Sequence, residues 1–178
     1  SAPAPPQLAT PTDLRLEEVQ AISEAVNPLI ADALALYVKT KNFHWHVAGP
    51  HFRDYHLMLD EQAGSILDSV DTMAERVRRI GGTTLRSIGH ISRLQTIGDD
   101  DDEFVPAEQM MQRLLADNRH MAKMQRAAIT VCDDNRDTAT SNRLQEILDG
   151  TEKRVWFLHE AVQAMAQAGR AQPEHRAA

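Results

Sequence analysis

Residues 52–82 read FRDYHLMLDEQAGSILDSVDTMAERVRRIGG, and this stretch decides the fold class. Its apolar residues recur at alternating steps of four and three, the spacing of one face of an α-helix that packs against other helices. That stripe consists of Leu59, Ala63, Ile66, Val70, Met73, Val77 and Ile80. Gly81-Gly82 ends the pattern, since glycine commonly follows a helix C-terminus. We therefore predict a long helix that ends near residue 80.

Three other segments show a similar spacing, at residues 16–36, 106–132 and 144–165. Pro28 interrupts the first of them. Either the helix kinks there, or Asn27 caps a second helix that has Pro28 at its first position. Strand-like alternation is absent from the sequence, so four helices with a long link between the second and third predict an all-α four-helix bundle with one crossover.

The crossover, residues 83–104, contains Ile88, Ile91 and Leu94 at the spacing of a short additional helix. It ends in the acidic run Asp99–Glu103, which we expect to be a solvated loop. Asp133, Asp134 and Asp137 are expected to be solvated turn residues between the last two long helices.

Length and composition indicate one domain of ordinary globular type, with 178 residues and 42% hydrophobic residues. We predict a flexible tail over residues 1–12, the bundle over 13–168 and a second flexible tail over 169–178. No run of 18 apolar residues is present, and residues 1–12 lack the basic and apolar regions of a signal peptide, so we expect no membrane span. Cys132 is the only cysteine, which favours a reducing, cytoplasmic location and a buried, inert thiol.

The charge of the chain argues against a dedicated nucleic-acid binder, because the formal net charge is −7. Arg15 is the only basic residue ahead of Lys39, and the C-terminal tail offers only Arg170 and Arg176. So few cations cannot supply the many phosphate contacts that set the affinity for DNA. We therefore predict that DNA binding is weak or absent.

The second helix also carries a polar face that bears imidazole and carboxylate groups. At 100° per residue, Asp60, Asp71 and Glu75 lie roughly 40°, 60° and 100° around the helix from His56. This face is separate from the apolar stripe. His44, at the end of the first helical arm, can add a further ligand because Gly49-Pro50 turns the chain back. Such a nitrogen and oxygen set without thiolate suits iron, manganese or zinc, and redox work would favour iron.

Helix length decides how these residues can meet. Asp60 and Asp71 are eleven residues apart, which is about 16 Å along a helix, whereas metal–ligand bonds are about 2 to 2.6 Å. The two pairs therefore cannot share an ion within one straight helix. They can meet if the same helix of a second chain crosses antiparallel, with small Gly64 near the midpoint, because a two-fold interface is self-complementary. We predict a site shared between subunits.

The segments KTKNFHWHVAGPHF, HLMLDEQ and DTMAERVRRIGG resemble the Dps family, small ferritin-like proteins named for protecting DNA in starved cells. The resemblance covers about residues 14–168. It implies a ferritin-like four-helix bundle with a short extra helix in the crossover. The residues that match the ferroxidase ligands of the family are His44, His56, Asp60, Asp71 and Glu75.

The resemblance also implies a function. Family members form shells of twelve subunits, oxidise Fe(II), typically with hydrogen peroxide rather than dioxygen, and store ferric mineral. By this resemblance we expect the chain to be a ferroxidase that protects the cell from oxidative stress, with zinc or manganese as possible substitutes for iron. Trp45 matches a position proposed to quench radicals, although from the residues alone Trp45 and Trp156 are expected in the core. The family's ion-entry pores are lined by acidic residues near Asp133, Asp134 and Asp137.

Two other functions compete with this one. A non-enzymatic, DNA-condensing protein of the nucleoid is the main alternative, and the lysine-free tails and negative charge argue against it. A di-iron oxygenase with its site inside one chain would need Glu-x-x-His on two helices. The sequence contains no Glu-x-x-His, so this alternative is remote.

Overall fold

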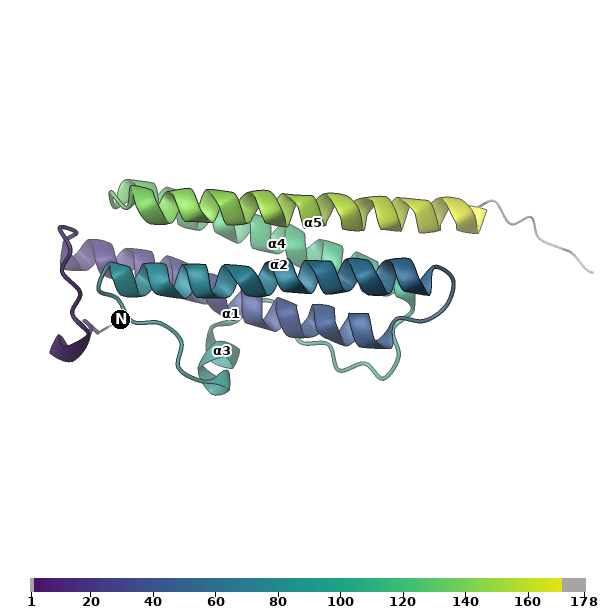
Figure 1. Cartoon of the computed structure of the whole chain (residues 1–178), viewed down its shortest axis with the longest axis horizontal. Coiled ribbons are helices and arrows are strands. Elements are labelled where there is room, and N and C mark those ends of the chain that lie inside the picture. The colour runs from purple at the N-terminus through teal and green to yellow at the C-terminus, as the bar shows by residue number, and fades with distance from the viewer. Residues whose placement is uncertain (1, 171–178) are drawn as a thin grey trace, which may run out of the picture.

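The computed structural model describes residues 2–170, and within them every regular element is helical (Figure 1). The helices are α1 (Leu16–His46), α2 (Phe52–Arg79), α3 (Ile88–Leu94), α4 (Ala107–Asp134) and α5 (Thr138–Arg170), with a short 3₁₀ helix at Pro6–Leu8. Helices α1, α2, α4 and α5 lie along one another as a bundle, and α3 lies outside it in the crossover between α2 and α4. The predicted fold class is confirmed.

The predicted apolar stripes form the core of the bundle. On α2, all members of the stripe are buried except Val70, which is half-buried against the core. On α4, the stripe from Met111 to Cys132 is buried throughout, including the polar Asn118 and Gln125. Each long helix packs against two neighbours: α1 against α2 and α4, and α5 against α4 and α2. Hydrophobic burial between these neighbours stabilises the bundle as one unit.

Helix α1 runs without a break through Pro28, so the alternative of a second helix capped by Asn27 is wrong. Proline lacks the N–H that an interior helical residue donates, yet packing along the whole length of α1 maintains the helix. By length and composition α1 could cross a membrane, but half of its most apolar window is buried inside the bundle, as in a core helix.

Asp32 attaches the crossover to the middle of α1. Its carboxylate is fully buried and accepts hydrogen bonds from the Thr96 N–H at 2.6 Å, the Ile97 N–H at 2.9 Å and the Thr96 hydroxyl at 2.6 Å. The following acidic run is not simply solvated, contrary to expectation. The Asp100 carboxylate is nearly buried and pairs with Arg113 at 2.8 Å. These contacts give a long, irregular segment a defined path over the bundle.

Asp137, expected to be solvated, is instead buried at 4% exposure. It caps α5 by accepting the Thr140 N–H at 2.9 Å, and it pairs with Arg76 of α2 at 3.3 Å. Of the three acidic residues, Asp133 and Asp134 are exposed, but they belong to the last turn of α4 rather than to the link between the helices. A buried carboxylate that is already paired cannot line a pore, so Asp137 is not available for the suggested ion-entry role.

The predicted flexible N-terminal tail lies against the bundle in this structure. The Thr10 hydroxyl donates to the Arg78 carbonyl at 2.9 Å, and the Arg78 guanidinium donates to the Leu8 carbonyl at 3.0 Å. The helical part of the chain extends to Arg170, beyond the predicted boundary at 169. The remainder of the predicted C-terminal tail, residues 171–178, lies outside the described residues.

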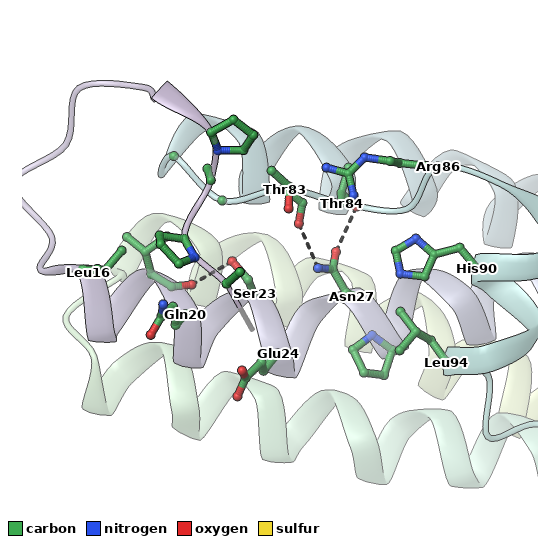
Figure 2. A pocket seen from close by; sticks show the side chains of 18 residues that line it. Leu16, Gln20, Ser23, Glu24, Asn27, Thr83, Thr84, Arg86, His90 and Leu94 are labelled. Carbon is green, nitrogen blue, oxygen red and sulfur yellow. Dashed lines mark hydrogen bonds between the residues drawn. The ribbon is translucent and has the colours of Figure 1, made fainter. Parts of the chain in front are cut away.

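A cleft of about 540 Å³ lies between residues 2–5 and the N-terminal half of α1. Figure 2 shows Asn27 on its wall, where the side-chain amide donates to the Thr83 carbonyl at 2.9 Å and accepts from the Thr84 hydroxyl at 2.9 Å. None of the predicted ligands lines this cleft, because His44 is at the opposite end of α1.

Candidate metal centre

His44 and His56 are brought together where the last turn of α1 meets the first turns of α2. The tight link between the helices contains Gly49 at φ 99° and His51 at φ 63°, both in the left-handed region. This reversal stacks the two imidazole rings with centroids 3.8 Å apart and planes at 17°. The predicted approach of His44 to the second helix is therefore what the structure shows.

Reciprocal hydrogen bonds determine the tautomer of both rings. His44 Nδ1–H donates to the His56 carbonyl at 2.7 Å, and His56 Nδ1–H donates to the His44 carbonyl at 2.8 Å. A carbonyl can only accept, so each Nδ1 must carry the proton when the ring is neutral. Each Nε2 then has a free lone pair, the arrangement that metal-binding histidines show when the other ring nitrogen donates to a carbonyl.

Asp60 completes this group one turn further along α2. Its Oδ1 lies 3.9 Å from His44 Nε2. Two ligands of one ion at bond lengths of about 2.1 Å are separated by about 3 to 3.5 Å, so a small side-chain movement would bring both onto a metal. His44 is buried, whereas Asp60 is exposed, so the group opens to the surface of the chain.

Lys41, a residue that the sequence analysis did not single out, forms an ion pair with the Asp60 carboxylate. Its ammonium donates to Asp60 Oδ1 at 2.8 Å and lies 5.8 Å from the centre of the Trp45 ring. The hydrogen bond from Lys41 lowers the pKa of the Asp60 carboxyl and keeps it ionised. Lys41 precedes His44 by three residues on α1, so helical spacing could have shown that it lies on the same side as the first ligand.

Asp71 and Glu75 lie apart from this group, three to four turns further along α2. Both are exposed, and Glu75 pairs with Arg79 at 2.8 Å. Among residues 2–170, no three His, Cys, Asp or Glu side chains of one chain gather closely enough to hold a metal ion. The candidate ligands of one chain therefore lie in two separate places: His44, His56 and Asp60 near the start of α2, and Asp71 and Glu75 further along it. The first three would need side-chain movement to hold an ion.

Trp45 and Trp156 were expected in the core, and this expectation is wrong for the single chain. Their exposures are 62% and 61%. Trp45 follows the buried His44 and Trp156 follows the half-buried Val155, but both indole side chains are on the outer faces of α1 and α5. Cys132, by contrast, is buried as predicted, and burial raises the pKa of its thiol to about 12. A protonated, buried thiol is a poor nucleophile and a poor metal ligand.

The four-helix bundle with a short helix in its crossover is that of a ferritin-like protein, and comparison with known proteins agrees. The family model of the ferritin-like domain matches residues 23–168, so the chain belongs to that family. Within it, the chain is a member of the Dps family.

Individual relatives support the narrower assignment. The DNA protection during starvation protein of Brevibacillus brevis is 33% identical over 143 residues, which are 78% of this chain and 93% of that protein. DNA protection during starvation protein 1 of Deinococcus radiodurans is 29% identical over 145 residues, 82% of this chain and 70% of that protein. The solved structure of DpsC from Streptomyces coelicolor superposes with a TM-score of 0.83 at 28% identity and covers 86% of this chain and 90% of its own.

Proposed function

We propose that this protein oxidises Fe(II), preferentially with hydrogen peroxide, at sites shared between two subunits, and stores the ferric product in a shell of twelve subunits. The observation that carries the proposal is the division of the ligands. His44, His56 and Asp60 form a group with both Nε2 atoms free, while Asp71 and Glu75 remain exposed on the same helix.

An antiparallel crossing of two α2 helices would place each three-ligand group opposite the two carboxylates of the partner. Gly64 lies between the two sets and has nothing within 4 Å of the position of a Cβ atom. A second helix can approach closely where no side chain projects. The geometry of α2 thus supports two equivalent sites across a two-fold axis.

The chemistry at each site follows from the donors. Two Fe(II) ions each give one electron to one hydrogen peroxide molecule, whose O–O bond breaks to give two hydroxide ions, so that no hydroxyl radical is released. The carboxylates stabilise the higher charge of the Fe(III) product. Zn(II) and Mn(II) suit the same nitrogen and oxygen donors. Trp45 adjoins His44 and is placed to give up an electron to an oxidant that escapes the site.

A complementation experiment tests the shared site. Asp60→Ala and Glu75→Ala each damage every site in a homogeneous shell, so we expect fast Fe(II) oxidation to be lost in both. In a shell assembled from equal amounts of the two variants, mixed pairs contain one intact and one doubly damaged site. Random pairing therefore restores about a quarter of the wild-type rate.

Asp149→Ala, which removes an exposed carboxylate from α5, provides the matched control and should retain the wild-type rate. A site contained within one chain predicts no recovery in the mixture, since every chain carries one of the two substitutions. That result, or unchanged oxidation in both single variants, would overturn the proposal.

We further propose that the protein acts in the cytoplasm and protects by consuming iron and peroxide rather than by binding DNA. The relatives named above carry DNA protection in their names, but the present chain has a net charge of −7 and few cations near its ends. DNA condensation remains the second candidate. Retardation of plasmid DNA at physiological salt would favour it over the present proposal.

A further inference from the structure

Arg154 places a guanidinium inside the bundle, away from the proposed metal centre. The residue is 6% exposed and belongs to the inner face of α5. Its Nε donates to Asn118 Oδ1 at 2.8 Å, Nη1 to Ser65 Oγ at 3.1 Å and Nη2 to Thr151 Oγ1 at 2.9 Å. Three helices thus supply acceptors to this side chain.

All three acceptors are neutral, so the buried positive charge lacks a counterion within the chain. Across residues 2–170, no carboxylate forms an ion pair with Arg154. Burial without a compensating anion lowers the pKa of Arg154 to about 10. A guanidinium has five N–H donors, and the three hydrogen bonds leave two of them unused. An unpaired buried charge is costly, so an anion beside it would be stabilised.

Gly150 lies one helical turn before Arg154 on the same face of α5, and its missing side chain leaves room for at least one more heavy atom beside the guanidinium. A Cβ atom built on Gly150 would meet Ser65 Oγ at 3.8 Å and Arg154 Nη1 at 3.9 Å, which are ordinary contact distances. The missing side chain therefore leaves a notch between α2 and α5. A hydroxyl and a guanidinium nitrogen border it.

Gln62 adds an unpaired donor on the same side of α2. It precedes Ser65 by three residues, is 6% exposed, and has no hydrogen-bond partner at either amide atom. Buried amides usually have a partner, such as an ordered water or an ion. Ser65 itself is exposed and Gly150 is half-buried, so these donors lie at the edge of the bundle between α2 and α5.

We propose that the notch at Gly150 binds a small inorganic anion, which accepts hydrogen bonds from Arg154 Nη1 and Ser65 Oγ. The anion neutralises the guanidinium and thereby stabilises the association of α2 with α5. Chloride and inorganic phosphate both offer this chemistry. The site is independent of iron oxidation, because none of its residues belongs to the two sets of metal ligands.

Thermal unfolding of the assembled, metal-free protein tests the proposal. The protein is kept in sodium gluconate, and chloride or phosphate replaces the gluconate stepwise at constant ionic strength. We expect Tm to rise by about 5–10 °C when the free anion reaches about a hundred times its dissociation constant. The ³⁵Cl NMR line should broaden on addition of protein. If phosphate reverses the broadening, both ions compete for the notch. If the broadening persists in phosphate, the notch binds chloride and not phosphate.

Gly150→Ala is the decisive variant, since its methyl group fills the notch without a close contact. Alanine favours a helix over glycine, so the Tm of this variant in gluconate should increase, while the anion-dependent rise disappears. Gly169→Ala on the same helix has nothing within 4 Å of its Cβ and is the matched control. It should keep the full anion-dependent rise. Arg154→Met should also lose the rise, and if this variant fails to fold, Gly150→Ala alone decides.

Two results would overturn the proposal. One is a wild-type Tm that depends only on ionic strength, with no difference between chloride, phosphate and gluconate. The other is an anion-dependent rise of equal size in the wild type and in Gly150→Ala, which would place the anion elsewhere on the protein.

Discussion

At the scale of single residues, two backbone carbonyls control the chemistry of the candidate metal centre. They accept the Nδ1 protons of His44 and His56 and so leave both Nε2 atoms available. This arrangement depends on each histidine lying opposite the other's carbonyl, which no spacing along the sequence reveals. The types of ligand were predictable, and their protonation pattern was not.

The pair formed by Lys41 and Asp60 leads to a prediction at the same scale. A metal ion must displace the ammonium from Asp60 Oδ1, where it now lies at 2.8 Å. Lys41→Met removes this competitor, so Zn²⁺, used as a redox-inert probe, should bind several-fold more tightly in calorimetric titrations at pH 7. Lys41→Arg keeps the charge and should bind zinc as the wild type does. Equal affinity in wild type and Lys41→Met would show that the ammonium does not compete.

At the scale of elements, the start of α1 is tied to the turn between α4 and α5. The Arg136 guanidinium, on a residue at φ 64°, donates to both carboxylate oxygens of Glu18, at 3.0 and 2.8 Å. Glu18 also accepts the Arg15 N–H at 2.8 Å, which closes the first turn of α1. One buried carboxylate thus joins two segments at the same end of the bundle (Figure 1) that are more than 110 residues apart in the chain.

This contact predicts a dependence of stability on pH. Hydrogen bonds from Arg136 and from the Arg15 backbone hold the pKa of Glu18 far below its usual value in the folded state. A lowered folded pKa contributes stability above the unfolded pKa of about 4.3, and this stability is lost as the pH falls below it. Glu18→Gln should therefore lower the urea midpoint at pH 7 and flatten its decline between pH 4.5 and 3.

The neighbouring exposed carboxylate supplies the control for that measurement. Glu17 is 67% exposed and pairs only with Arg15, at 3.4 Å. Glu17→Gln should leave both the urea midpoint and its pH dependence close to the wild type. A decline in Glu18→Gln as steep as that of the wild type would mean that another group causes the acid sensitivity.

At the scale of the whole molecule, a single chain leaves large apolar side chains on its surface. Trp45, Trp156 and Ile88 are 62%, 61% and 80% exposed, and Phe52 and Leu67 are more than 40% exposed. Exposed apolar surface on this scale is typical of a chain that associates with others. The two tryptophans are the only ones in the sequence, so their fluorescence reports directly on association.

We predict a native particle of about twelve times 19.9 kDa by light scattering, with tryptophan emission typical of buried indole. Dissociation into folded single chains should shift the emission to the red, because both rings become exposed. Trp156→Phe isolates the signal of Trp45 beside the shared site. A particle of 20 to 40 kDa with red-shifted emission would contradict the assembly and, with it, the shared metal centre.

The sequence alone determined the helices, the apolar stripes, the short helix in the crossover and the ligand face of α2. These features follow from periodicity, which is local and therefore visible in the order of residues. The sequence could not decide whether α1 continues through Pro28, whether Asp137 is buried or whether the tryptophans are exposed. Nor could it show that the Lys41 ammonium pairs with Asp60. Each of those depends on which residues from distant parts of the chain lie side by side, and only the tertiary packing of the helices settles that.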